Sequence, residues 1–358
     1  MLFFWAPDES RPRGGIKQIY RHVEILEQAG IEACVLHTQA GFSCRWFEHR
    51  ARLGYLGESP LRRIHRKLVA GVYRWWPDED LALVEGRAIQ VSDGKGGFSA
   101  HVLAASDVLV MPEYLGASLA KANIEVPMAI FNQNVHGTFW GYGLGENAAS
   151  TVYTRPSVLG AIVVSEHNRR YLEYAFPSLD VQRVVNGVDS ALFHPNDSPR
   201  EKRVAFMPRK KREHLEQVIN ILQSRGAFAG WELTPIDGMD EAGVAELLRR
   251  SFVFLSTCYE EGFGLPPVEA GMAGCLVVGY TGSAADEYFE EGLCERVDQD
   301  DILGFAQAVE QTLAWVDSDE EAALARGRAF SELLSERYSL ERERETVLSA
   351  WRTILAKS

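Results

Sequence analysis

The sequence is poor in cysteine and has no long apolar run. Five of its 358 residues are cysteine, and none belongs to a Cys-x-x-Cys pair. An odd number of scattered cysteines argues against a disulfide framework or a zinc site, so we expect a reducing, cytoplasmic location. No apolar stretch approaches the roughly 18–20 residues of a membrane-spanning helix. The apolar segment at the start of the sequence is too short for a signal peptide and lacks the basic residues that precede one. Residues 2–6 are therefore predicted to form a buried strand.

Positive charge is also scarce. The chain has 37 lysines and arginines against 50 acidic residues, a net charge of −13. This balance argues against a general nucleic-acid-binding protein but leaves room for a local basic site. The length predicts about two domains. Three Asp-x-Asp triplets, which we interpret as solvated caps and turns, do not support a metal site; they lie at 78–80, 298–300 and 317–319.

The most informative stretch is a glycine-rich segment, residues 261–270, which read EGFGLPPVEA. The apolar run 251–255 before it predicts a buried strand, and residues 275–280 after it predict another. Pro267 suits the first turn of the helix expected to begin at Val268, because proline lacks an N–H that would be unpaired there. The segment is therefore predicted to be a strand–loop–helix–strand unit with its loop at the carboxyl end of a strand. Ligands bind at this place in open parallel sheets.

Two carboxylates bracket this loop, Glu261 and Glu269, with seven residues between them. Glu261 should project from the loop. Glu269 should project from the first helical turn, where the helix dipole favours an anion. The alternative is a pair of surface glutamates beside an ordinary loop.

This pattern resembles the Glu–seven residues–Glu motif of retaining glycosyltransferases of family 4, which have the GT-B fold. The resemblance implies an α/β fold of two Rossmann-like, doubly wound parallel-sheet domains that face a cleft. It implies an acceptor-side domain at 1–190 and a donor domain at 191–339, with a helix at about 340–358 that packs back on the first domain. It covers residues 155–358 well, including NGVDSALFHP at 186–195, and residues 1–150 loosely.

The same resemblance implies roles for the motif residues. Glu261 would be the catalytic carboxylate that holds hydroxyls of the donor sugar, and Glu269 would hold the ribose hydroxyls. A carboxylate suits both tasks because it accepts two hydrogen bonds. The backbone of four loop residues would contact the donor: Gly262, Phe263, Gly264 and Leu265.

A basic turn, PRKKR at 208–212, lies between an expected strand at 203–207 and a helix. Four cations at a helix N-terminus are unfavourable unless an anion binds there. A nucleotide diphosphate would explain them. By the resemblance Arg209 is the donor-binding arginine, and Lys210 and Lys211 are both candidates for the lysine. The alternative is a solvated basic turn.

Two features of the first half fit the same interpretation. Gly14 and Gly15 open an amphipathic helix after the first strand, and Gly15 is a candidate donor contact because glycine lets a ligand approach the backbone. The polar segment 132–139 follows an expected strand at 127–131. By the resemblance, His136 in this segment is a catalytic candidate close to the transferred sugar. The alternative there is a structural turn of amides and glycine.

Residues 49–76 are rich in arginine and carry an apolar stripe at helical spacing from Leu61 to Trp75. Such a basic amphipathic helix suits the surface of an anionic membrane or an anionic acceptor. The other interpretation is a surface helix packed on its own sheet.

The expected function is a retaining, metal-independent glycosyltransferase without a cofactor. It would move a sugar from a nucleotide-diphosphate donor to a glycan, a glycolipid or a similar hydroxyl acceptor. Two alternatives stay open: a GT-B nucleotide-sugar epimerase, and a non-catalytic nucleotide-binding subunit on the same scaffold.

Overall fold

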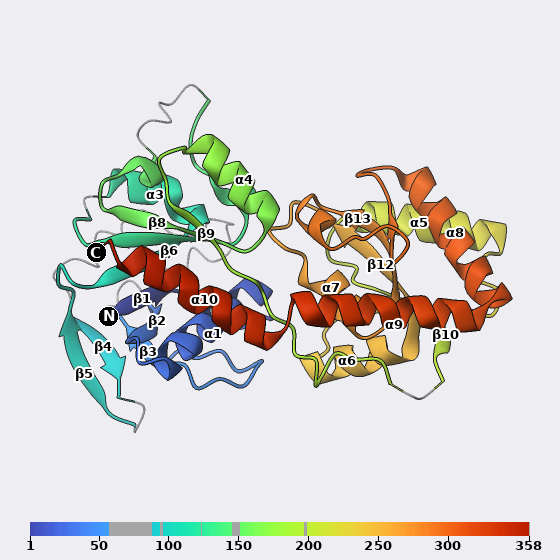
Figure 1. The fold of residues 1–358 in the computed structure, drawn as a ribbon, viewed down its shortest axis with the longest axis horizontal. Coiled ribbons are helices and arrows are strands. Elements are labelled where there is room, and N and C mark those ends of the chain that lie inside the picture. The colour runs from blue at the N-terminus through green and yellow to red at the C-terminus, as the bar shows by residue number, and fades with distance from the viewer. Residues whose placement is uncertain (57–87, 94–95, 123, 145–150, 197–198, 358) are drawn as a thin grey trace, which may run out of the picture. The chain divides into compact units, whose positions relative to one another are not determined.

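A computed structural model describes residues 1–56, 88–93, 96–122, 124–144, 151–196 and 199–357 (Figure 1). The chain forms two compact units. Unit 1 comprises 1–164, 168–184 and 344–358, and unit 2 comprises 165–167 and 185–343. Residues 57–76 of the predicted basic helix lie outside the described residues, whereas Leu53–Tyr55 at its start form a strand.

The described part of unit 1 contains a nine-stranded sheet in the order β5-β4-β3-β2-β1-β6-β7-β8-β9. Its strands are β1 (Leu2–Trp5), β2 (Ala33–His37), β3 (Leu53–Tyr55), β4 (Ala88–Ser92), β5 (Phe98–Val102), β6 (Val108–Pro112), β7 (Met128–Asn132), β8 (Val158–Val163) and β9 (Val181–Arg183). The central strands β1, β2, β6 and β7 are buried along their whole length. Continuous apolar runs such as Leu2–Trp5 are typical of parallel strands that are covered on both faces.

The sheet of unit 1 is parallel, as predicted, except at one edge. β3 pairs with β4 and β4 pairs with β5 in antiparallel fashion, which adds a hairpin at one edge of an otherwise parallel sheet. Exposed and buried residues alternate along β4, as expected for a strand with one solvated face. Antiparallel strands can be joined by a short turn, whereas parallel strands need a crossover connection that is usually a helix. The hairpin of β4 and β5 therefore extends the sheet without an additional helix.

Helices connect and cover this sheet. They are α1 (Gly14–Gln28), α3 (Gly116–Lys121), α4 (Glu166–Ala175) and α10 (Leu340–Leu355), with short 3₁₀ turns η2 (Glu113–Leu115), η3 (Val135–Gly137) and η5 (Val152–Thr154). Within unit 1, α10 lies beside α1, where Arg344 donates to Gln28 at 3.1 Å (Figure 1). The fully buried Trp351 meets Phe4 edge-on, with ring centroids 5.1 Å apart. The last helix thus completes the core of unit 1.

The described residues of unit 2 form a five-stranded, all-parallel sheet in the order β11-β10-β12-β13-β14. Its strands are β10 (Glu201–Phe206), β11 (Glu232–Pro235), β12 (Ser251–Cys258), β13 (Leu276–Thr281) and β14 (Glu295–Arg296). Its helices are α5 (Arg212–Arg225), α6 (Glu241–Arg250), α7 (Leu265–Met272), α8 (Ile302–Ser318), α9 (Glu320–Arg337) and the 3₁₀ turn η6 (Ala284–Glu287). The predicted strand–loop–helix–strand unit around the glycine-rich segment is confirmed as β12–α7–β13.

Each sheet has a point where the strand order reverses. In unit 1 this point lies between β1 and β6, and in unit 2 it lies between β10 and β12. The chain connections leave these two strands toward opposite faces of the sheet, which opens a crevice at their carboxyl ends. These two places therefore position the candidate site residues.

None of the described helices combines the length and apolarity needed to cross a membrane.

Candidate functional site

The predicted site residues of unit 2 lie at its strand-order reversal. Arg209 and Lys210 follow the carboxyl end of β10, and Glu261 follows the carboxyl end of β12. These two strands are parallel neighbours, with Phe206 paired to Leu255. Residues 51 and 52 positions apart in the chain are therefore brought together at one edge of the sheet.

A direct ion pair joins the glycine-rich loop to the basic turn. The Lys210 ammonium lies 2.7 Å from Glu261 Oε1 and donates to the Tyr259 carbonyl at 3.0 Å. Both charged side chains are partly exposed, at 37% and 23%. A small pocket opens beside the pair, with walls formed by residues of β12, the basic turn and the start of α7: Met207, Arg209, Phe254, Leu255, Ser256, Thr257, Cys258, Pro266 and Pro267. The pair is thus open to a ligand that carries both negative charge and hydroxyl groups.

The neighbouring lysine points elsewhere. Lys211 Nζ lies 2.7 Å from Asp300 and 4.0 Å from the centre of the Tyr259 ring. Asp300 also lies 3.7 Å from His214, which is in the first turn of α5. Lys211 therefore ties the basic turn to the residues before α8, whereas Lys210 reaches the carboxylate of the motif.

Backbone conformations that non-glycine residues rarely adopt gather at this edge of unit 2. Among the described residues, four non-glycine residues have a positive φ, and each follows the carboxyl end of a strand of the second sheet: Lys211 (44°), Glu260 (49°), Ser283 (68°) and Asp300 (70°). Each such residue costs roughly 1–3 kcal/mol, and strain of this kind is concentrated at active sites and ligand clamps. This clustering supports the interpretation that the edge is a functional site.

The loop at 262–264 is held from the protein interior. The buried hydroxyl of Tyr288 donates to the carbonyl of Gly264 at 2.6 Å and lies 3.2 Å from that of Phe263. Gly264 has φ 85°, and a Cβ there would lie 2.8 Å from the Tyr288 hydroxyl. Glycine is required at this position, because any side chain would be strained and would push the loop off its anchor.

The predicted position of Glu269 in the first helical turn is wrong. α7 begins at Leu265 and not at Val268, so its first turn contains no acidic residue. Gly264 adopts a left-handed conformation and precedes the helix, and the two prolines occupy the first turn, where missing N–H groups have no cost. Glu269 consequently lies one turn further along, where the helix dipole acts on it less.

Cys258 ends β12 in the wall of this pocket and is buried. Burial, and secondarily the charge of Glu261, raises the pKa of its thiol to about 12. A thiol with this pKa is not a nucleophile near neutral pH. Cys258 is therefore a buried structural side chain.

Two predicted site residues belong to unit 1. Gly15 lies in the first turn of α1, and its carbonyl accepts a bond from the side-chain amide of Gln133 at 3.0 Å. A Cβ at Gly15 would lie 3.1 Å from Gln133 Oε1. His136 is exposed in η3, and its backbone N–H donates to Asn134 at 3.2 Å. The loops that follow β1 and β7 therefore meet at the carboxyl edge of this sheet.

A buried carboxyl group that the sequence did not single out supports this loop. Glu113 follows β6 directly and is 8% exposed. It accepts a bond from the backbone N–H of Gln133 at 3.2 Å, and its Cγ lies 3.0 Å from where Gly137 would carry a Cβ. Burial raises the pKa of Glu113 to about 7. In the sequence, the one indication of a role for Glu113 is that it is a polar residue directly after a buried strand.

Replacing Glu113 by glutamine should remove a pH dependence of stability. Because the pKa of Glu113 is raised from about 4.5 to about 7, its stabilising contribution is present below pH 4.5 and is lost as the pH rises to 7. The wild type should therefore lose up to about 3 kcal/mol relative to Glu113→Gln between pH 5 and pH 8. Urea unfolding of both proteins at several pH values measures this. Parallel pH profiles of the two proteins would contradict the prediction.

Among the described residues, no group of three histidine, cysteine, aspartate or glutamate side chains is arranged to hold a metal ion.

Comparisons with known proteins assign the fold. No family model matches the chain. Solved structures superpose on nearly the whole chain, among them sucrose-phosphate synthase from Thermosynechococcus elongatus, with a TM-score of 0.64 at 15% identity, covering 100% of this chain and 99% of that one. S. aureus TarM in complex with fondaparinux, α-GlcNAc-glycerol and UDP matches with a TM-score of 0.63 at 11% identity, covering 99% of each chain. The chain therefore has the α/β GT-B fold, as predicted.

Two further similarities are to proteins whose names or bound ligands refer to glucose. Anabaena HepE in complex with UDP-glucose matches with a TM-score of 0.62 at 13% identity, covering 98% of this chain and 99% of that one. In sequence, the chain is 22% identical over 221 residues to an alpha-1,6-glucosyltransferase of Actinobacillus pleuropneumoniae. The match covers 58% of this chain and 63% of that relative.

Proposed function

We propose that this protein is a nucleotide-sugar glycosyltransferase that uses a UDP-sugar donor. The observation that carries the proposal is the Glu261–Lys210 pair at the strand-order reversal of unit 2, beside a pocket lined by Arg209. A carboxylate that accepts hydroxyl groups next to two cations matches a sugar joined to a diphosphate. The likeness to HepE with UDP-glucose and to a glucosyltransferase in sequence supports a UDP-hexose.

The proposed chemistry is a transfer in which the sugar–phosphate bond breaks and the acceptor oxygen bonds to the same sugar carbon. The departing diphosphate gains negative charge and takes up the proton of the acceptor hydroxyl. Arg209, Lys210 and the N–H groups at the start of α7 would stabilise this charge without a metal ion. Glu261 would hold the sugar hydroxyls, and Glu269 would hold the ribose. We further propose that the configuration of the transferred sugar is retained, as in the family that the motif resembles.

Unit 1 is proposed to bind the acceptor, which is a glycan or another compound with a hydroxyl group. His136, proposed to lie close to the transferred sugar, and Gly15, proposed as a donor contact, lie at the carboxyl edge of its sheet, where ligands bind in folds of this type. TarM, whose fold this chain shares, was crystallised with α-GlcNAc-glycerol, a sugar carrying a glycerol group. This supports a hydroxyl-bearing acceptor.

A thermal-shift screen with UDP, GDP, dTDP, ADP and their sugars tests the donor. A donor present at 100 times its Kd should stabilise the fold by about 2.7 kcal/mol. Incubation of the best UDP-sugar with candidate acceptors, followed by mass spectrometry, then tests transfer. Absence of stabilisation by any uridine compound would contradict the proposal. Release of a free epimer without an acceptor product would instead favour an epimerase.

The two adjacent lysines offer a matched pair of variants. Lys210→Met should lower kcat/KM at least tenfold more than Lys211→Met, because Lys210 contacts Glu261 and Lys211 contacts Asp300. Both changes remove one positive charge from a partly exposed lysine, so the net charge of the basic turn falls equally. Steady-state kinetics with a saturating acceptor measure the difference. If the two losses were equal, the effect would be one of total charge and Lys210 would have no distinct role.

A further inference from the structure

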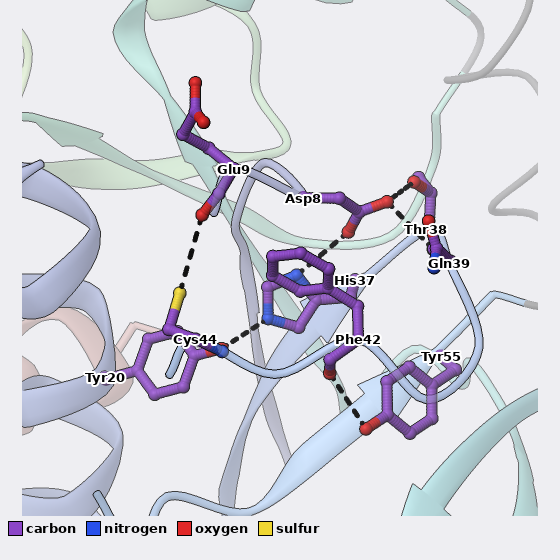
Figure 2. A network of polar contacts seen from close by, with 9 residues as sticks. All are labelled: Asp8, Glu9, Tyr20, His37, Thr38, Gln39, Phe42, Cys44 and Tyr55. Atoms are coloured by element: carbon purple, nitrogen blue, oxygen red, sulfur yellow. Dashed lines mark hydrogen bonds and ion pairs between the residues drawn. The ribbon is translucent and has the colours of Figure 1, made fainter. Parts of the chain in front are cut away.

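Three polar side chains of unit 1, Asp8, His37 and Tyr20, form a hydrogen-bonded series near the carboxyl end of β2 (Figure 2). Asp8 Oδ1 lies 3.0 Å from His37 Nδ1, and His37 Nε2 lies 2.7 Å from the Tyr20 hydroxyl. The His37 side chain is 0% exposed and that of Asp8 is 5% exposed. Tyr20 is also fully buried.

The chemistry of the three groups determines which atom donates in each of these hydrogen bonds. The Asp8 carboxylate only accepts, so His37 Nδ1 carries the hydrogen of that bond. Nε2 then accepts from the Tyr20 hydroxyl, and burial raises the pKa of Tyr20 well above its ordinary value, which keeps that hydroxyl protonated. The hydrogen bonds therefore run in one direction, from the Tyr20 hydroxyl through the His37 ring to the Asp8 carboxylate. Removal of the Tyr20 hydroxyl or of the Asp8 carboxylate takes one partner away from the buried His37 ring.

The hydrogen bonds of Asp8 and Tyr20 to the His37 ring connect the two segments that flank the Gly14–Gly15 pair. Asp8 lies in the connection from β1 to α1, six residues before Gly14. Tyr20 lies in α1, five residues after Gly15. His37 is the last residue of β2, so both flanks are attached to the same rigid strand.

Further bonds fix the connection from β1 to α1 over its first residues. The other oxygen of Asp8 accepts from the Thr38 hydroxyl and from the backbone N–H of Gln39 at 3.0 Å. Cys44 contributes twice: its backbone N–H donates to the Tyr20 oxygen at 3.3 Å, and its thiol lies 3.8 Å from the Glu9 carbonyl (Figure 2). The loop is therefore anchored to two segments, residues 37–39 and Cys44, and Cys44 also contacts Tyr20.

The glycine pair itself remains open. Gly14 and Gly15 are exposed, and Gln133 contacts Gly15 from the β7 loop. The backbone is thus presented to solvent while its flanks are held from the interior. Such an arrangement suits a backbone that a ligand must approach closely and in one fixed position.

We propose that Asp8, His37 and Tyr20 are positioning residues for the transfer reaction, which clamp the Gly14–Gly15 backbone against its substrate. This inference rests on the proposed function. A misplacement of about 1 Å by a change away from the reacting atoms costs up to about 100-fold in rate. A clamp that keeps the glycine pair in place before substrate binds avoids this loss.

The test compares two tyrosine-to-phenylalanine variants. Tyr20→Phe removes the hydroxyl that joins α1 to His37. Tyr55→Phe is the matched control, because its buried hydroxyl donates to the Phe42 carbonyl at 3.0 Å and does not join the flanks of the glycine pair. Each variant loses one hydroxyl from the same region of unit 1.

In Tyr20→Phe we expect kcat to fall about tenfold with the donor KM changed less than threefold, and the amides of residues 8–16 to exchange hydrogen at least tenfold faster. In Tyr55→Phe we expect less than a twofold change in kcat and unchanged exchange at residues 8–16. Should Tyr20→Phe fail to fold, Asp8→Asn, which keeps the side-chain volume, should show the same pattern.

Equal effects in the two tyrosine variants, or unchanged exchange at residues 8–16 in Tyr20→Phe, would overturn the clamp. Wild-type protein that transfers no sugar from any UDP-sugar would contradict the proposed function instead. The exchange measurement needs no turnover, so it decides on the clamp in that case as well.

Discussion

Glu261→Ala is expected to lower glycosyl transfer by roughly 10²–10³-fold while unit 2 stays folded. The carboxylate is proposed to hold the donor sugar, and its loss also frees Lys210, which it contacts at 2.7 Å. Both side chains are partly exposed, so water can solvate the lysine left behind and the cost in stability should be about 1 kcal/mol or less. Steady-state kinetics and thermal unfolding of the same preparation measure both quantities.

The adjacent carboxylate provides the control. Glu260 is exposed, has φ 49° and lies in the same loop. Glu260→Asn removes the same charge, and asparagine tolerates a left-handed backbone better than most residues. We expect less than a threefold change in turnover. A folded Glu261→Ala variant with wild-type turnover would show that the proposed site is wrong.

Gly279→Ala is expected to destabilise unit 2 by roughly 2–6 kcal/mol, enough to unfold it or nearly so. Gly279 lies in β13 with φ 133°, a backbone conformation that residues with a Cβ rarely adopt. An added Cβ would lie 2.2 Å from the Ser256 carbonyl oxygen of β12 and 2.7 Å from the Phe305 ring. The carbonyl belongs to a paired strand and cannot move without disrupting the sheet. Urea unfolding and hydrogen exchange across unit 2 measure the loss.

Gly226→Ala separates the two causes of this expected loss. Gly226 follows α5 with φ 71°, and an added Cβ would meet nothing within 4 Å. The variant therefore keeps the backbone strain without the steric clash, and we expect a loss of about 1–2 kcal/mol. If Gly279→Ala cost no more than Gly226→Ala, the packing between β12, β13 and α8 would be looser than the structure indicates.

The order of elements around the glycine-rich segment was predictable, because its signals are local. Apolar runs of strand length and a glycine- and proline-containing connection specified β12, α7 and β13. The beginning of α7 was not predictable to the residue. Gly264 adopts a left-handed conformation and allows the helix to begin at Leu265, and this conformation depends on the Cys258 and Tyr288 side chains packed against it.

The choice between the two lysines also lay beyond the sequence. Lys210 and Lys211 are chemically equal and adjacent, and the positive φ of Lys211 directs the two side chains to different partners. Asp300 lies 89 positions from Lys211, and only the pairing of the strands brings the two together. Glu113 and the chain of Asp8, His37 and Tyr20 were missed for the same reason, because each joins segments that are separate in sequence.

By itself, the sequence determined the glycine-rich loop between Glu261 and Glu269, since apolar runs, glycine and proline act over a few residues. The fold class followed from the resemblance of this segment to a known motif. The tertiary structure decided which residues meet. The reversal of strand order in each sheet gathers loops from distant segments at one carboxyl edge. Burial then changes the chemistry of the groups beneath them, as it does for Glu113 and Cys258. Contacts of this kind depend on how strands are ordered and paired, and no local pattern of residues records that order.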